Sequence, residues 1–575
     1  MRRIVPTVGC ALILVLSGCI GQPRADDPVE PSLLPPILDL PLFEGERLKV
    51  DVRVPVVLLG FPEDVAKELA GRLDAEAVDH NVGEFVQTLP PDPGEPQALL
   101  PLQFRTFDLP MFPTAVFDVR IADAQLAADV AALLPQLHLG DEIVAVYNGN
   151  AFEDFLAERL PAAGIPVDPT NPPLVLVHLD GFGVGLHGWR YDYPHGYLST
   201  VQTFGERQPL LVVDPSASKL RPPNALQSTL QGVTGNKPNP AASRTEATDV
   251  DRLERIVREA MHFRILQSTI YPTALSDCHA ITLIYAWRPT NVSPLLGLRH
   301  GDDLLNADEL KLAYEHLTGG TVHVDVKKLL LPVDDPVLDA LARGEFGTLE
   351  LQRYWLSQNW DKYWVPHEGC EPYVSFVLHG DVASTPSGII GIGTYDSVKS
   401  YRISISWVNE ALRLAFDPAS PTNLFGHASG AYNWVQFLFA HEVGHTIGMH
   451  HTFHTGKKAG GIQNNYFEEV WSAMGYRQDG RVIDFGAVDA NNFQRSRAGF
   501  LFLAGHHLGL AGSEAWTNAL EQAASYDWRS AAQTLWAAVA PAAEATDEGG
   551  SALPWLPGDL VVFPRPHAEG AHAWR

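Results

Sequence analysis

The stretch His441–His451 reads HEVGHTIGMHH, which follows the pattern H-E-x-x-H-x-x-G-x-x-H. Residues four positions apart lie on the same face of an α-helix, so His441 and His445 can bind one metal ion. Gly448 can adopt the positive φ that ends a helix, and the chain can then turn back so that His451 supplies a third nitrogen. This spacing predicts a helix that carries a three-histidine metal site near its end.

Glu442 lies beside the first histidine and is not needed as a ligand. Three histidine ligands leave one coordination position open for water, which distinguishes a catalytic zinc site from a structural one. A carboxylate next to such a site can take the proton of the water that the metal acidifies. We therefore expect zinc as the cofactor, bound by His441, His445 and His451, with Glu442 as a catalytic residue.

A second motif follows the histidines: Met474 lies 23 residues after His451, in the sequence S-x-M-x-Y that ends at Tyr476. With both motifs, the segment 441–476 resembles the metzincins, zinc peptidases in which a methionine-containing turn lies beneath the metal. The resemblance implies that Met474 is this structural methionine and that Tyr476 hydrogen-bonds the oxyanion that develops on the substrate. The S-x-M-x-Y form is similar to that of astacins and serralysins, whereas Thr452-Phe453 resembles the pappalysins.

The resemblance also implies the fold, α/β (α+β): a catalytic domain with a twisted mixed sheet and a helix that carries the histidines. Apolar runs at 373–378, 388–393 and 401–407 read as strands. In metzincins the substrate lies antiparallel to an edge strand, so by this resemblance one of the last two runs is that edge. A helix expected at about 487–505 resembles the last helix of such domains.

A different arrangement of the metal site is also compatible with the sequence. Glu468 or Glu469, downstream of H-E-x-x-H, would give the gluzincin pattern, although that pattern leaves Gly448, His451 and Met474 unexplained. The remaining histidines of this region are expected to be ordinary polar residues: His427, His450, His454 and His506.

The first residues of the chain read as a targeting signal. Residues 1–18 contain Arg2-Arg3, an apolar run, and Leu-Ser-Gly directly before Cys19. The run is shorter than the about 20 residues that span a bilayer. The pattern resembles a lipoprotein signal peptide that is cleaved so that Cys19 carries lipid, with a simple secretion signal as the alternative. It predicts a chain anchored to a prokaryotic membrane on the extracytoplasmic side.

Charge and cysteine usage limit the classes of partner and the compartment. The formal net charge of −27 provides no basic footprint, so we expect no nucleic-acid partner. Cys10 lies in the signal and Cys19 carries the lipid, which leaves Cys278 and Cys370. These two form a possible disulfide of an exported protein, with two free thiols as the alternative.

Composition and periodicity divide the chain into five segments. They are a lipoprotein signal peptide (1–18), a proline-rich tether (19–45), an N-terminal α/β domain (46–170), a catalytic region with insertions (171–510, core about 249–510) and a helical appendage (511–575). The role of residues 46–170 is open between a pro-domain, a substrate-positioning module and a packing partner.

The expected function is that of a membrane-anchored extracytoplasmic zinc endopeptidase that acts on protein or peptide substrates. Two alternatives belong to other classes: a non-catalytic surface-binding lipoprotein that zinc stabilises, and a zinc hydrolase of a non-protein amide such as a cell-wall cross-link. No motif indicates the oligomeric state.

Overall fold

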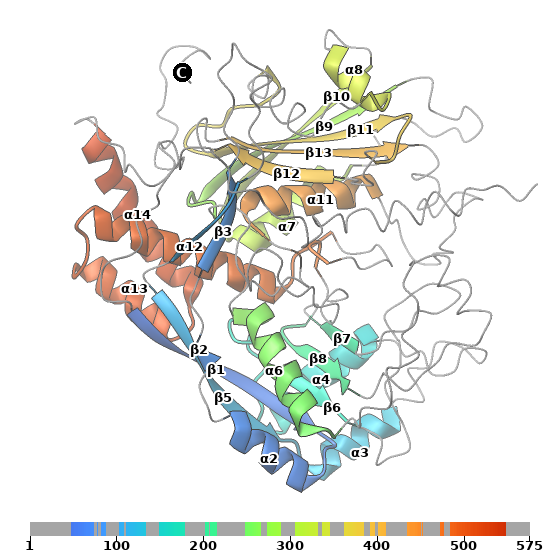
Figure 1. Cartoon of the computed structure of the whole chain (residues 1–575), viewed down its shortest axis with the longest axis vertical. Helices are drawn as coiled ribbons and strands as arrows, with labels where there is room; N and C mark the ends of the chain where they lie inside the picture. The colour runs from blue at the N-terminus through green and yellow to red at the C-terminus, as the bar shows by residue number, and fades with distance from the viewer. Residues whose placement is uncertain are drawn as a thin grey trace, which may run out of the picture.

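The computed structural model describes part of the chain, and all structural statements below concern that part. The described residues are 48–73, 77–78, 82–87, 103–108, 111–133, 149–178, 202–205, 208–215, 248–265, 273–288, 305–331, 336–345, 362–384, 391–396, 401–409, 434–449, 451, 472–475 and 483–547. They form two mainly parallel sheets with helices packed against them, which confirms the α/β class (Figure 1).

The first sheet has the strand order β2-β5-β1-β6-β8-β7. Strands β5, β1, β6 and β8 are parallel to one another, and β2 and β7 add antiparallel edges. The strands are β1 (Leu48–Leu59), β2 (Ala77–Val78), β5 (Met111–Ile121), β6 (Leu174–Val177), β7 (Gln202–Gly205) and β8 (Leu211–Asp214). A separate hairpin consists of β3 (Val82–Gln87) and β4 (Gln103–Asp108).

Helices cover both faces of this sheet, which explains why β6 and residues 54–59 of β1 are continuously apolar. In β1, Val56 and Leu58 face the core that holds α2 (Glu63–Leu73) and α6 (Val250–Ile265). Val57 and Leu59 face the opposite core, because successive strand side chains alternate. That second core is formed with α3 (Ala124–Leu133) and α4 (Gly149–Ala162).

The expected domain boundary at residue 170 is wrong. Strands β6 and β8 were assigned to the catalytic region, but β6 pairs with β1 and β8 pairs with β6 inside the first sheet. The extent of a sheet depends on hydrogen bonds between segments that are distant in the sequence, and a local pattern does not reveal which strands pair. The first unit therefore continues beyond residue 170 and includes β6 to β8, with α6 packed against it.

The second sheet has the order β10-β9-β11-β13-β12, in which the first four strands are parallel and β12 is an antiparallel edge. The strands are β9 (Cys278–Trp287), β10 (Thr321–Leu330), β11 (Glu371–Gly380), β12 (Gly391–Asp396) and β13 (Tyr401–Asn409). The three strands predicted at 373–378, 388–393 and 401–407 are thus present as β11, β12 and β13. β9 and β10 were not predicted.

The two faces of the second sheet are covered differently. One face packs against α7 (Ala307–Thr318) and α11 (Trp434–Ile447). The other packs against α8 (Pro336–Ala342) in a core that includes Trp407. Figure 1 shows α11 directly beneath the sheet, alongside β12. The predicted histidine helix therefore lies on the same face of the second sheet as α7.

Three C-terminal helices join the two sheets into one body. They are α12 (Ala487–His507), α13 (Glu514–Ala524) and α14 (Trp528–Asp547). Helix α12 is close to the helix predicted at about 487–505, and α13 and α14 lie in the predicted helical appendage. Their apolar residues share one core with β1, α2 and α6 of the first unit. The N-terminal unit and the appendage therefore pack against each other. Among the described helices, none has the length and apolar character needed to cross a membrane.

Candidate metal centre

Helix α11 buries its polar side chains together with its apolar ones. Val435, Phe439 and Val443 lie in the core beneath the second sheet. His441 and Glu442 occupy adjacent positions of this helix and therefore point in different directions, yet each is only 3% exposed. Buried polar groups lower stability unless they are hydrogen-bonded or bind a ligand, so α11 needs partners for both side chains.

Gly448 ends the helix as predicted. Its φ is 126°, a conformation that favours glycine. The amides of Gly448 and Met449 donate to the carbonyl oxygen of Gly444 at 3.2 and 3.0 Å, which closes the last turn. After this turn the chain brings His451 back towards the helix.

The three predicted ligands converge through their Nε2 atoms. The distance between the Nε2 atoms of His441 and His445 is 3.2 Å, and the same distance separates His441 from His451. His445 and His451 are 3.1 Å apart. His441 and His445 are buried, and His451 is half-buried.

Backbone carbonyl groups fix the orientation of two of these rings. The Nδ1 atom of His441 donates to the carbonyl oxygen of Ala473 at 2.6 Å, and that of His445 donates to Met449 at 2.8 Å. A carbonyl oxygen only accepts, so both Nδ1 atoms carry the proton and both Nε2 atoms present lone pairs. Burial lowers the pKa of His441 to about 3 and that of His445 to about 4, which keeps both rings neutral.

This geometry fits a metal ion. Two unprotonated nitrogens about 3.2 Å apart repel each other unless a cation lies between them. A tetrahedral ion with bonds of about 2.0–2.1 Å to nitrogen requires ligand atoms about 3.3 Å apart, close to the separations found. His441, His445 and His451 can therefore hold a metal ion and leave one coordination position open.

Glu442 lies beside this group without belonging to it. Burial raises the pKa of its carboxyl to about 8, and within the described part of the chain its Oε2 atom has no hydrogen-bond partner. Strand β12 passes close over it: a Cβ atom on Gly391 would overlap Oε1 of Glu442 and approach Oγ of Ser406 to 2.7 Å. Only a glycine at this position allows the strand to lie against the carboxylate.

The predicted methionine turn lies beneath the histidines. Met474 is fully buried, and a Cβ on Gly444 of α11 would overlap its sulfur atom. The turn is held by the amide of Met474, which donates to Ser472 Oγ at 2.9 Å, and by the amide of Ala473, which donates to Asp484 at 2.7 Å. The Met474 turn thus fixes the Ala473 carbonyl that orients His441.

Asp489, on α12, anchors this turn and was not among the predicted residues. Its Oδ2 atom accepts hydrogen bonds from Ser472 Oγ and, at 3.3 Å, from the amide of Gly486. Burial raises the pKa of Asp489 to about 7. A chain of contacts therefore runs from α12 through Ser472 to the carbonyl partner of His441. The sequence signal that could have indicated it is an acidic residue in the first turn of a helix.

Arg402 fixes the C-terminal end of α11 and was also not predicted. It is buried on β13, where its Nη1 donates to the carbonyl oxygen of Thr446 at 2.6 Å and its Nε to Glu371 at 2.6 Å. A positive charge at a helix C-terminus interacts favourably with the unpaired carbonyl groups there. Arg402 thereby holds the last turn of α11 against the sheet.

The remaining predicted residues divide into two groups. Cys278 and Cys370 are joined in a disulfide, as predicted, and His506 is exposed on α12. The others lie outside the described residues: Cys19, His427, His450, Thr452, Phe453, His454, Glu468, Glu469 and Tyr476.

Comparison with known proteins does not identify a family. No protein-family model matches the chain, and no curated protein matches it. The site is therefore interpreted from its own geometry.

Proposed function

We propose that this protein is a zinc-dependent metalloendopeptidase, and that it is tethered by lipid to the outer side of a prokaryotic membrane. One observation carries the proposal: three imidazole Nε2 atoms converge within 3.1–3.2 Å, next to the carboxylate of Glu442, which is not a ligand. The metzincin resemblance of residues 441–476 supports the same assignment.

Zinc is the metal that best suits this donor set, since it takes neutral imidazole ligands in tetrahedral geometry and needs no redox partner. When bound, zinc supplies a Lewis acid that lowers the pKa of water to about 7 and polarises a carbonyl group. The carbonyl groups of Ala473 and Met449 hold His441 and His445 in the tautomer that such binding requires.

Glu442 is proposed to move the proton. Its Oε2 atom takes a proton from the attacking water and then donates it to the leaving amine. Burial raises the pKa of this carboxyl, which favours the protonated form that donates to the leaving amine. By the resemblance, the hydroxyl group of Tyr476 hydrogen-bonds the oxyanion of the tetrahedral intermediate.

A polypeptide is the substrate class that the surroundings favour. Among the described strands, β12 pairs with β13 alone, so its other edge can pair with an extended peptide. Gly391 and Gly393 place this edge against α11, since a Cβ on Gly393 would come within 2.9 Å of Cβ of His445. A peptide bound along β12 would therefore pass the metal site and Glu442.

Cleavage of an unfolded protein substrate tests the proposal. The zinc-loaded full chain should cleave it, and both a zinc chelator and Glu442→Gln should abolish cleavage. The Glu442→Gln variant should retain its zinc, because Glu442 is not a ligand. A folded, zinc-loaded wild type that cleaves no polypeptide would contradict the proposal and favour a structural metal.

A further inference from the structure

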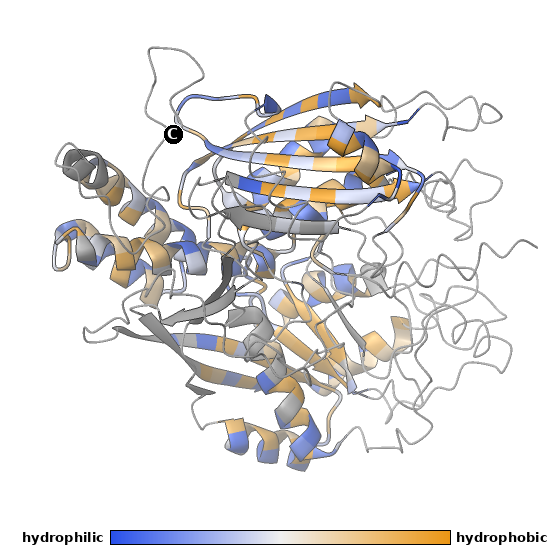
Figure 2. Ribbon diagram, turned by 45° about the horizontal axis from the view of Figure 1, so that its top comes forward, coloured by the Kyte–Doolittle hydropathy of each residue, from blue (hydrophilic) through white to orange (hydrophobic). Residues whose placement is uncertain are grey.

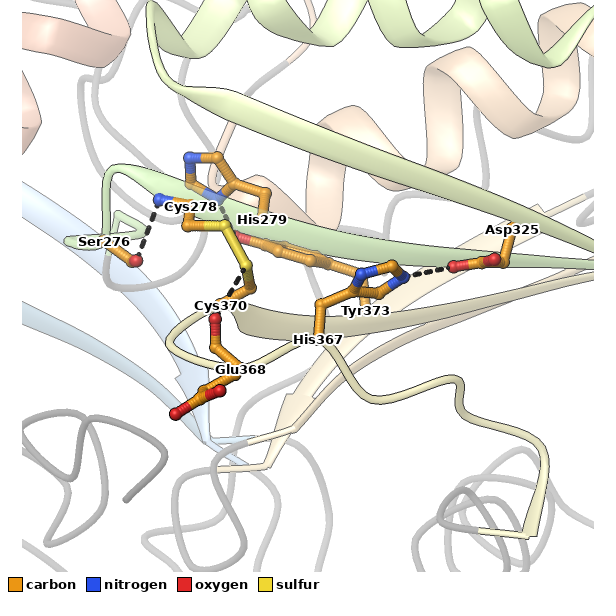
Figure 3. The surroundings of a disulfide bond; sticks show 8 residues. All are labelled: Ser276, Cys278, His279, Asp325, His367, Glu368, Cys370 and Tyr373. Carbon is orange, nitrogen blue, oxygen red and sulfur yellow. Dashed lines mark hydrogen bonds and ion pairs between the residues drawn. A yellow bond between two sulfur atoms is a disulfide. The ribbon is translucent and has the colours of Figure 1, made fainter. Parts of the chain in front are cut away.

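A second group of potential ligands lies at another place in the second sheet, around the disulfide. Cys278 begins β9 and Cys370 directly precedes β11, and their bond links these neighbouring strands across 92 residues of sequence (Figure 3). Cys370 is 1% exposed and Cys278 is half-buried.

The imidazole of His323 lies against this disulfide. One ring nitrogen of His323 and the two sulfur atoms all lie within 4.8 Å of one another. The strand register explains this placement: Cys278 is opposite Thr321 on β10, and His323 is two residues further along the same strand. Residues two apart on a strand face the same side of the sheet, so His323 points to the side of the cysteines.

Neighbouring side chains hold His323 in place. Its ring stacks on that of His367, with centroids 4.2 Å apart and an interplanar angle of 13°. His367 in turn contacts Asp325 through its Nε2 atom, 2.6 Å from Oδ2, which Figure 3 also shows. Asp325 therefore adds negative charge beside the cluster and fixes the ring on which His323 packs.

We propose that reduction of the Cys278–Cys370 disulfide turns this cluster into a second metal site, with the two thiolates and His323 as ligands to a thiophilic divalent cation such as zinc. Two sulfur ligands and one nitrogen ligand are a donor set that such a cation prefers. The proposal does not depend on the peptidase activity, because its ligands are separate from the three histidines: Cys278 on β9, His323 on β10 and Cys370 directly before β11.

The redox step balances with a dithiol as reductant. The dithiol is oxidised to its own disulfide, the sulfur–sulfur bond of Cys278–Cys370 breaks, and two electrons and two protons pass to the cysteine sulfurs. Binding of the cation then releases both protons to solvent, because thiolate is the form that binds. The metal restores the link between β9 and β11 that the disulfide provided.

Cobalt titration can separate this site from the three histidines. The substitutions Cys10→Ser and Cys19→Ser leave Cys278 and Cys370 as the only two of the four cysteines in the chain. The histidine site is first filled with zinc. Co²⁺ is then added to the oxidised protein and, separately, to protein that a phosphine has reduced. The phosphine is oxidised to its oxide, and water supplies the oxygen atom.

The reduced protein should bind one equivalent of Co²⁺ with the near-ultraviolet charge-transfer absorption of a thiolate ligand, and the oxidised protein should not show it. His323→Ala should weaken this binding by at least about tenfold. The matched control His506→Ala, at an exposed histidine on α12, should leave it unchanged.

Two results would overturn the proposal. One is a reduced protein with native circular dichroism that binds Co²⁺ without thiolate absorption. The other is thiolate-ligated Co²⁺ whose affinity is the same in the His323→Ala variant. If reduction alone unfolds the chain, zinc present during reduction should keep it folded, and unfolding despite zinc would count equally against the site.

Discussion

Helices α2 and α11 pack against two sheets of similar construction, yet they bury different chemistry. The exposed face of α2 carries charged residues such as Glu63 and Lys67, and its buried face is formed by Ala66, Leu69 and Leu73. Figure 2 shows that α2, at the bottom of the view, carries both hydrophilic and hydrophobic residues. Every residue of α11 from 435 to 447 is buried, including two histidines and a glutamate. An amphipathic helix such as α2 is explained by packing alone, whereas packing alone does not explain the buried histidines and glutamate of α11.

The largest effect should come from removing a ligand on α11. His445→Ala should lower zinc affinity by more than roughly 100-fold, because even changes behind a metal ligand cost 10–100-fold. Zinc content after dialysis measures this loss. His506→Ala, at an exposed position of α12, is the control and should retain its zinc. Equal zinc content in both variants would show that the histidines of α11 do not bind the metal.

A smaller effect is expected where β12 crosses α11. Gly391→Ala places a Cβ where the Glu442 carboxylate lies, so that the strand or the carboxylate must move. A displacement of about 1 Å can cost about 100-fold in rate, so we expect peptidase activity to fall by about 10–100-fold while zinc content is unchanged. Steady-state kinetics and zinc analysis on the same sample separate the two quantities. Unchanged kcat/KM would exclude close packing of β12 on Glu442.

A matched pair of glycine substitutions compares the two helices directly. Gly444→Ala in α11 would overlap the sulfur of Met474, and overpacking of this kind costs about 1–3 kcal/mol of stability. Gly71→Ala in α2 meets no atom within 4 Å and should stabilise the protein by about 0.5–1 kcal/mol, because alanine favours a helix. Denaturant unfolding gives both values, and the same sign for both would contradict the packing described.

The last effect concerns the pH dependence of stability. The pKa of Asp489 is raised to about 7 by burial, whereas in the unfolded chain it is near the ordinary value of 3.8. Between these values the folded state keeps a proton that the unfolded state has lost, so its contribution to stability falls as pH rises. Asp489→Asn should therefore lose less unfolding free energy between pH 5 and pH 8 than wild type does.

The control for this pH effect is Glu63→Gln at the exposed start of α2. The ion pair of Glu63 with Lys67 is exposed to solvent, so its removal should change the free energy of unfolding little. A wild-type pH dependence that persists unchanged in Asp489→Asn would show that this carboxyl group is ionised in the folded protein at pH 5.

The sequence predicted the parts of the molecule that depend on local spacing. A local motif was sufficient to predict the metal ligands His441, His445 and His451 and the turn at Gly448, because all of them lie on one helix or directly after its end. The carbonyl partners of the histidines could not be predicted, because every residue has a carbonyl group. Asp489 reaches Ser472 only through the packing of α12, which no local pattern encodes.

Long-range strand pairing limited the prediction of the fold. Strand β9 is buried on both faces, and such a continuous apolar run does not distinguish a strand from a buried helix. Strand β10 carries Val322, Val324 and Val326 at alternate positions, a pattern that indicates a strand with one apolar face. The boundary at 170 was misplaced because β6 joins β1 through pairing between segments more than a hundred residues apart.

Zinc K-edge X-ray absorption of the zinc-loaded, oxidised protein identifies the ligands of the metal directly. Three imidazole nitrogens and one oxygen are expected at about 2.0 Å from the metal. A sulfur ligand at about 2.3 Å, or a protein that does not retain zinc, would contradict an open centre formed by His441, His445 and His451.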